Sequence, residues 1–180
     1  MTLRTIAGEM GISQGNLNYH FKKREDIIRE LYFQLVARID EKVDGKALEA
    51  PSLRALFDIS VTIMDSFYKY RFFLLDFVQI IREDKKIRDH YLQLSRQREE
   101  QFEQLFSGLI KYGTLKKEEF VGQYANLYKR WNIMGDFWLS SALLTQGRNE
   151  KKQIQEYSRI IGESIIPYLT ERGKREYFGL

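Results

Sequence analysis

The sequence predicts an all-α protein of 180 residues. Long stretches repeat apolar residues at the three- and four-residue spacing of amphipathic helices. Only two prolines, Pro51 and Pro167, interrupt these stretches. A chain of this length can bury a sizeable core. It has no cysteine, which excludes disulfides, thiolate metal sites and cysteine nucleophiles together.

Residues 2–21 are predicted to form two short helices joined by a tight turn. Gly11 provides the open backbone that ends the first helix, and the hydroxyl of Ser13 caps the second. The apolar positions of the two helices fall on one side at helical spacing: Ile6, Ala7, Met10, Leu17 and Phe21. This pattern indicates a helix-turn-helix.

The second short helix places hydrogen-bonding side chains outside or at its edges, as direct readout of the major groove of DNA requires. Basic residues lie at both ends of this helix, where phosphates would lie, and Glu9 is the single acid up to Arg24. The alternative is an ordinary solvated face. The candidate contacts to double-stranded DNA are Thr2, Arg4, Ser13, Gln14, Gly15, Asn16, Asn18, Tyr19, His20, Lys22, Lys23 and Arg24.

This region resembles the DNA-binding domain of the TetR family of bacterial transcription regulators. The resemblance is ungapped over about the first 30 residues and rests on Thr2-x-Arg4-x-Ile6-Ala7, Gly11-Ile12-Ser13, Leu17-x-Tyr19-His20-Phe21 and Arg24-Glu25-x-Ile27. Asn18 stands where the family usually has tyrosine, which alters that contact. Arg24 stands in place of a lysine and can still hold a phosphate.

The family normally carries a further helix before this point, whereas Met1 opens directly on the second family helix. Without that helix, the apolar side of the two short helices loses a packing partner, and helices this short are marginal in water. We therefore expect the functional gene product to begin upstream of Met1. The alternatives are that the helix from about Arg24 covers this surface, or that DNA binding is weakened.

The rest of the chain is predicted to form a bundle of long helices. Asp44-Gly45 divides a DNA-binding domain with its connecting helix (1–44) from a helical ligand-binding and dimerisation domain (45–180). Proline near a first turn, a bend at Tyr70-Arg71 and glycines at helix ends mark further boundaries. The expected helices cover about 24–43, 52–69, 72–78, 87–112, 118–145 and a final one around 154–168, with Gly113 and Gly147 as helix ends.

The helix around 118–145 is apolar on more than one face, which indicates burial on two sides. The family resemblance implies pairing through the last two long helices, and a twofold dimer would present two reading helices to a palindromic operator. The alternative is a well-buried central helix. The candidate homodimer residues are Tyr128, Phe137, Trp138, Ser141, Tyr157, Ile161, Ile165 and Tyr168.

Aromatic side chains are frequent in the middle helices and are candidates to line a pocket for a small apolar or aromatic effector. The alternative is that they fill the core. The candidate pocket residues are Phe57, Met64, Phe67, Phe73, Phe77, Tyr91, Phe102, Phe106 and Trp131. In the resembling family, an effector bound between these helices changes the spacing of the two reading heads.

The sequence does not favour catalysis. His20 and His90 are far apart, with His20 in the reading helix and His90 expected at the surface. No phosphate-binding glycine loop, metal-ligand set or cofactor motif is evident. No run is apolar enough to span a membrane, and no signal peptide is present, so we expect a cytoplasmic protein.

These observations together predict a ligand-responsive transcriptional repressor that binds a palindromic operator as a dimer. The competing interpretation is a helical ligand-binding or scaffold protein that lacks effective DNA binding. Salt-dependent binding to the chain's own promoter separates the two.

Overall fold

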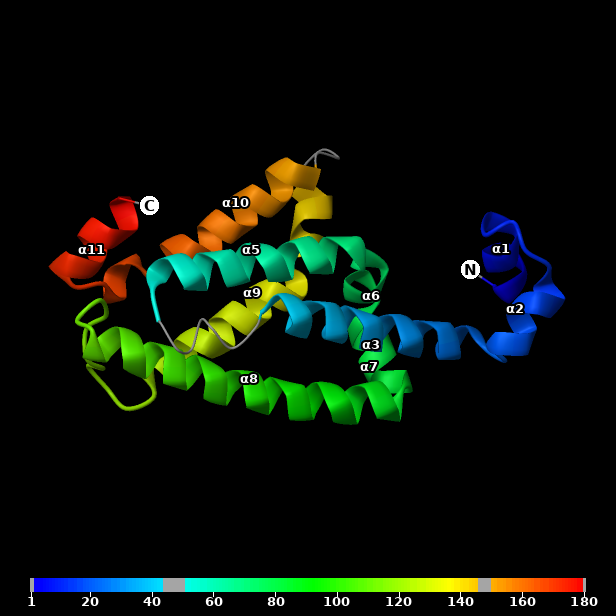
Figure 1. The fold of residues 1–180 in the computed structure, drawn as a ribbon, viewed down its shortest axis with the longest axis horizontal. Helices are drawn as coiled ribbons and strands as arrows, with labels where there is room; N and C mark the ends of the chain where they lie inside the picture. Colours follow the sequence, from blue (N-terminus) through cyan, green and yellow to red (C-terminus); the bar gives the residue numbers. More distant parts are fainter. Residues whose placement is uncertain (1, 44–50, 146–149, 180) are drawn as a thin grey trace.

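The computed structural model describes residues 2–43, 51–145 and 150–179, and its regular structure there is helical, which confirms the all-α prediction. Figure 1 shows α1 and α2 at one end of the molecule, connected by α3 to a helical body. The helices are α1 (Leu3–Glu9), α2 (Gln14–His20), α3 (Arg24–Lys42), α5 (Leu53–Lys69), α6 (Arg71–Leu75), α7 (Phe77–Glu83), α8 (Lys85–Lys111), α9 (Gln123–Thr145), α10 (Glu150–Glu163), the 3₁₀ turn η1 (Ile166–Tyr168) and α11 (Glu171–Phe178).

Local chemistry sets several of these boundaries. Ser52 begins α5 by accepting a hydrogen bond from the Ala55 amide at 3.1 Å. Tyr70 follows the last residue of α5 and precedes α6, which is the bend expected from the sequence. The long helix α8 is followed by Gly113, whose positive φ of 73° is open to glycine without strain.

Three clusters of buried side chains hold the body together, and they lie at different helix junctions. The first joins α5, α8, α9 and the C-terminal segment; the second joins α3, α6, α7 and α8; the third joins α5, α6, α9 and α10. Their largest fully buried members include Phe106, Ile87 and Trp138, one in each cluster. The helical body therefore has a divided core.

Several sequence expectations need correction or fall outside the described residues. The apolar run 72–78 is two short helices, because the chain turns at Asp76. Helix α9 begins at Gln123, after an exposed segment that contains Phe120. Asp44-Gly45, the expected domain boundary, and Gly147, the expected end of α9, lie outside the described residues.

The expected final helix is also shorter than predicted, because the chain turns after Glu163 and forms a further helix, α11. The Thr170 hydroxyl caps α11 by accepting from the Gly173 amide at 3.0 Å. Gly173 packs so closely that a Cβ there would lie 2.1 Å from the carbonyl oxygen of Thr114. Leu115 and Leu169 pair as an isolated bridge beside this contact. The C-terminal segment thus closes the end of α8.

Within the described residues, no helix is both long and apolar enough to cross a membrane.

Candidate nucleic-acid interface and the helices behind it

The helix-turn-helix is built from the features that the sequence indicated. The Thr2 and Thr5 side chains cap the first turn of α1 reciprocally, with Thr2 N donating to Thr5 Oγ1 at 2.7 Å. Gly11 has a φ of 68° in the turn, and Ser13 Oγ accepts from the Asn16 amide at 3.1 Å. Ala7 and Leu17 are buried where α1 and α2 pack together.

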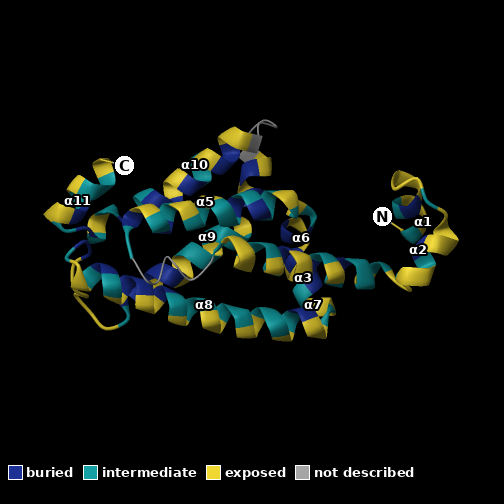
Figure 2. Cartoon of the chain, viewed as in Figure 1, coloured by how far each residue is buried: buried dark blue, intermediate teal, exposed yellow. Residues whose placement is uncertain are grey.

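The outward face of α2 is polar and open to solvent (Figure 2). Gln14, Asn16 and His20 are exposed, and Tyr19 is 79% exposed, with its ring edge-on to His20 at 5.2 Å between centroids. Thr2, Arg4, Ser13, Gly15, Lys22 and Lys23 are also exposed. A large aromatic ring that makes so little contact with its own chain is available to an external surface.

Asn18 and Arg24 are placed differently from the other candidate contacts. The Asn18 side chain is half-buried, and its Oδ1 is buried without a hydrogen-bond partner among the described residues. The Arg24 guanidinium lies 3.8 Å from the Asp76 carboxylate, between α6 and α7. Arg24 therefore connects the start of α3 to the body, a contact that its sequence position did not reveal.

Three contacts along α3 join it to α8 and to Asp84, the residue that caps the start of α8. Arg29 donates to Asp84 Oδ2 from Nε at 3.0 Å and from Nη2 at 2.7 Å. The Tyr32 hydroxyl is hydrogen-bonded to Nδ1 of His90 at 2.9 Å, and burial raises the pKa of Tyr32 to about 12. Arg98 pairs with Asp40 nearer the C-terminal end of α3. His90, expected at the surface, is half-buried because α3 covers it.

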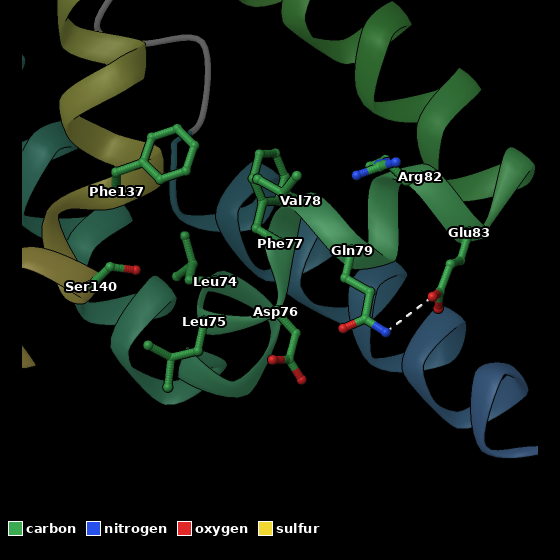
Figure 3. A pocket seen from close by; sticks show the side chains of 10 residues that line it. All are labelled: Leu74, Leu75, Asp76, Phe77, Val78, Gln79, Arg82, Glu83, Phe137 and Ser140. Atoms are coloured by element: carbon green, nitrogen blue, oxygen red, sulfur yellow. Dashed lines mark hydrogen bonds between the residues drawn. The ribbon is translucent and has the colours of Figure 1, made fainter.

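The predicted pocket residues do not surround one cavity. They are spread over the three core clusters, and Phe102 stacks on Phe106 with centroids only 4.0 Å apart, so this part of the core is filled. One of the nine, Phe77, lines a cavity elsewhere in the helical body. This cavity has a volume of about 750 Å³ and lies between α6, α7 and α9 (Figure 3), where it is lined by Leu74, Leu75, Asp76, Phe77, Val78, Gln79, Arg82, Glu83, Phe137 and Ser140.

Half of the predicted dimer residues are buried in the chain itself. Tyr128, Trp138, Ile161 and Ile165 are each at most 8% exposed in the single chain, where they belong to its core clusters. Phe137 is 43% exposed, Ser141 is exposed, and Tyr157 and Tyr168 are half-buried. The sequence pattern indicated that α9 is apolar on more than one face but not which apolar residues face inward.

An apolar stripe runs along the outside of α9, and the sequence reasoning named only part of it. Ile133 is 61% exposed and Leu144 is 87% exposed. Together with Phe137 and Ser141 they recur at intervals of three and four residues, which places them on one side of the helix. Ile160 of α10 adds a further exposed apolar side chain.

An all-helical chain with an N-terminal helix-turn-helix joined to a helical body has the architecture of a transcription regulator. Residues 34–177 match the TetR family model, which is described as a bacterial transcriptional repressor. The chain belongs to the TetR family of transcription regulators. This match covers the helical body and part of α3, so it is independent of the helix-turn-helix residues on which the resemblance rested.

The fold is similar to that of a TetR-family transcriptional regulator from Marinobacter aquaeolei VT8, with a TM-score of 0.82. The likeness covers 98% of this chain and 85% of that chain at 20% sequence identity, and it is a likeness of fold. No curated protein matches the sequence.

Proposed function

We propose that this regulator is a ligand-responsive repressor that binds a palindromic operator in the bacterial cytoplasm as a homodimer. The observation that carries the proposal is the exposed polar face of α2, whose other side packs on α1 with Leu17 buried. Gln14, Asn16 and His20 carry the hydrogen-bonding groups that direct readout uses, and they project from a helix whose other side is packed.

We assign base contacts and phosphate contacts to different residues. The amides of Gln14 and Asn16 can bond bidentately to adenine, and Tyr19 and His20 extend the same face. Arg4, Lys22 and Lys23 flank it and are assigned to phosphates. Asn18 is left out of base readout because its oxygen is buried, and Arg24 is assigned to the contact with Asp76.

We place the homodimer surface on the outward side of α9, with α10 beside it. Its apolar stripe supports this placement, because side chains as exposed as Ile133 and Leu144 lose unfavourable contact with water when a second copy covers them. Two copies related by a twofold axis present two α2 helices to the two halves of a palindrome.

Fluorescence anisotropy of the chain on its own upstream DNA, against scrambled DNA of equal length, tests this function. We expect specific binding that weakens steeply as salt is raised, since phosphate contacts release counterions. Equal, weak binding to both DNAs would contradict the repressor proposal and favour a helical scaffold. Light scattering on the same sample tests the dimer, and Ile133→Glu with Leu144→Glu should give monomers.

Single substitutions in α2 test the division of roles. Gln14→Ala and Asn16→Ala should each weaken operator binding about tenfold while leaving binding to scrambled DNA nearly unchanged. Lys23→Ala should weaken binding to both DNAs and flatten the salt dependence. Gln155→Ala, an exposed glutamine on α10, is the matched control and should change neither. Uniform effects of all three α2-region variants would refute this assignment.

A further inference from the structure

Asp136 is a half-buried carboxylate without a basic partner. It lies on α9 and accepts a hydrogen bond of 2.8 Å from the hydroxyl of Tyr91 on α8. Among the described residues, no lysine, arginine or histidine forms an ion pair with it. Every other described aspartate does form one: Asp26, Asp40, Asp58, Asp65, Asp76, Asp84 and Asp89.

The environment of Asp136 disfavours its charge, yet does not remove it at neutral pH. Burial raises the pKa of Asp136 to about 6, and the Tyr91 hydrogen bond only partly offsets this. The carboxylate is therefore mostly ionised at pH 7.5. An uncompensated charge between helices destabilises a fold, and such charges are found preferentially at functional sites.

Aromatic rings connect Asp136 with the cavity. The Phe77 ring packs edge-on against Tyr91, with centroids 5.1 Å apart, and lies 6.3 Å from the Phe137 ring. Phe77 and Phe137 both line the cavity, Phe77 from α7 and Phe137 from α9 (Figure 3). The Tyr91–Asp136 pair is thus one ring away from a cavity of the size that holds drug-like molecules.

The charges around the cavity largely compensate one another. Asp76 is paired with Arg24, and the other charged lining residues are Glu83 and Arg82, of opposite sign. Asp136 adds a half-buried negative charge beside the cavity with which no lysine, arginine or histidine of the described residues pairs. A ligand that brings a positive charge would pair with it.

We propose that the cavity and the Asp136 carboxylate behind it form a binding site for an organic cation with aromatic or bulky apolar substituents. The apolar substituents occupy the cavity between α7 and α9. The cation lies against the faces of Phe77, Tyr91 and Phe137, and Asp136 neutralises it. This inference rests on the proposed ligand response, and it specifies a positively charged effector where the sequence indicated an apolar or aromatic one.

Calorimetric titration of the full chain with tetraphenylphosphonium and with tetraphenylborate tests the site, because these ions share size and shape but differ in charge. At pH 7.5 and 150 mM salt, we expect the cation to bind at least tenfold more tightly. The formal net charge of +4 works in the opposite direction, so the preference has to come from the site. Equal binding, or tighter binding of the anion, would overturn the proposal.

Two variants locate the site. Asp136→Asn keeps the size and the hydrogen bond but removes the charge, and it should weaken cation binding at least tenfold without weakening anion binding. Phe77→Leu keeps an apolar side chain but removes the ring, and should weaken cation binding several-fold. Asp58→Asn, an exposed position on α5, removes the same charge elsewhere and should have no effect. Unchanged cation affinity in Asp136→Asn would overturn the assignment.

The titration needs no DNA, so its result is separate from that of the operator experiment. Operator binding without a cation preference would overturn the site and leave the repressor. A cation preference that Asp136→Asn abolishes would support the site even if operator binding failed. If the protein shows both operator binding and a cation preference, the complex of wild type with operator should dissociate as tetraphenylphosphonium is added. The complex of Asp136→Asn with operator should persist.

Discussion

Replacing Asp84 with alanine is expected to lower the free energy of unfolding by about 2–4 kcal/mol, because this carboxylate has two structural roles. It begins the 27-residue helix α8 by accepting from the amides of Lys86 and Ile87 at 2.9 and 3.0 Å. It also accepts both hydrogen bonds from Arg29 of α3, and its side chain is only 10% exposed. Urea unfolding followed by circular dichroism measures the loss.

Two further variants separate the capping role of Asp84 from its ion pair with Arg29. Asp84→Asn retains a good N-cap but loses the charge, so it should fall between the wild type and the alanine variant. Asp89→Ala removes an exposed carboxylate that pairs with Lys85 on the same helix, and should change stability by less than about 0.5 kcal/mol. Comparable losses at positions 84 and 89 would contradict the role given to Asp84.

The Asp84 contribution should also depend on pH. Burial by itself would raise the pKa of Asp84, but hydrogen bonds from Ile87 and Arg29 more than offset it and hold the pKa below its ordinary value of 3.8. The folded state therefore favours the ionised form. The difference in the free energy of unfolding between wild type and Asp84→Ala should have its full size above pH 5 and become smaller as the pH falls below 3.8.

Replacing Asp136 with asparagine should have the opposite effect and stabilise the protein by about 1–3 kcal/mol at pH 7.5. The pKa of Asp136 is raised from 3.8 to about 6 in the folded protein, so ionisation disfavours folding. Asparagine cannot ionise and can still accept the hydrogen bond from Tyr91. The gain in stability of Asp136→Asn over wild type should be complete above pH 6 and disappear as the pH falls towards 3.8.

Urea unfolding of both proteins at pH 7.5 and pH 4 measures this difference. Asp58→Asn, at a side chain that is 69% exposed, should stay within about 0.5 kcal/mol of wild type at both values. A less stable Asp136→Asn variant at pH 7.5 would contradict the burial argument. A more stable one would also show that loss of cation binding in the same variant does not come from unfolding.

The helix-turn-helix could be predicted almost completely from the sequence, because its determinants are local. Gly11 and Ser13 act within a few residues of their own positions, and the apolar spacing of α1 and α2 places Ala7 and Leu17 together. Met10, expected on the apolar side, is 61% exposed, and Arg24 is a second exception. Its partner, Asp76, is 52 positions away in the chain, so no local pattern could assign the contact.

The faces of α9 and the cavity could not be predicted from sequence, because they depend on how distant helices approach. Trp138 and Phe137 are neighbours of similar apolar character, yet one is 1% and the other 43% exposed. Among the aromatic residues, burial alone does not separate Phe106, which fills the core, from Phe77, which lines the cavity. No local pattern in the sequence singles out Asp136 either. It is set apart because no basic residue in the described part of the chain forms an ion pair with it.

Helix α3 also acts as a lever. With 19 residues it is about 28 Å long, and it carries α1 and α2 at its far end (Figure 1). A rotation of about 10° about the Asp40–Arg98 contact would displace the Arg24 end, about 24 Å away along the helix, by about 4 Å, more than the roughly 3.4 Å between base pairs. Arg24 contacts Asp76 and Arg29 contacts Asp84 near that end, so a shift of α7 or of the start of α8 is passed on to α1 and α2.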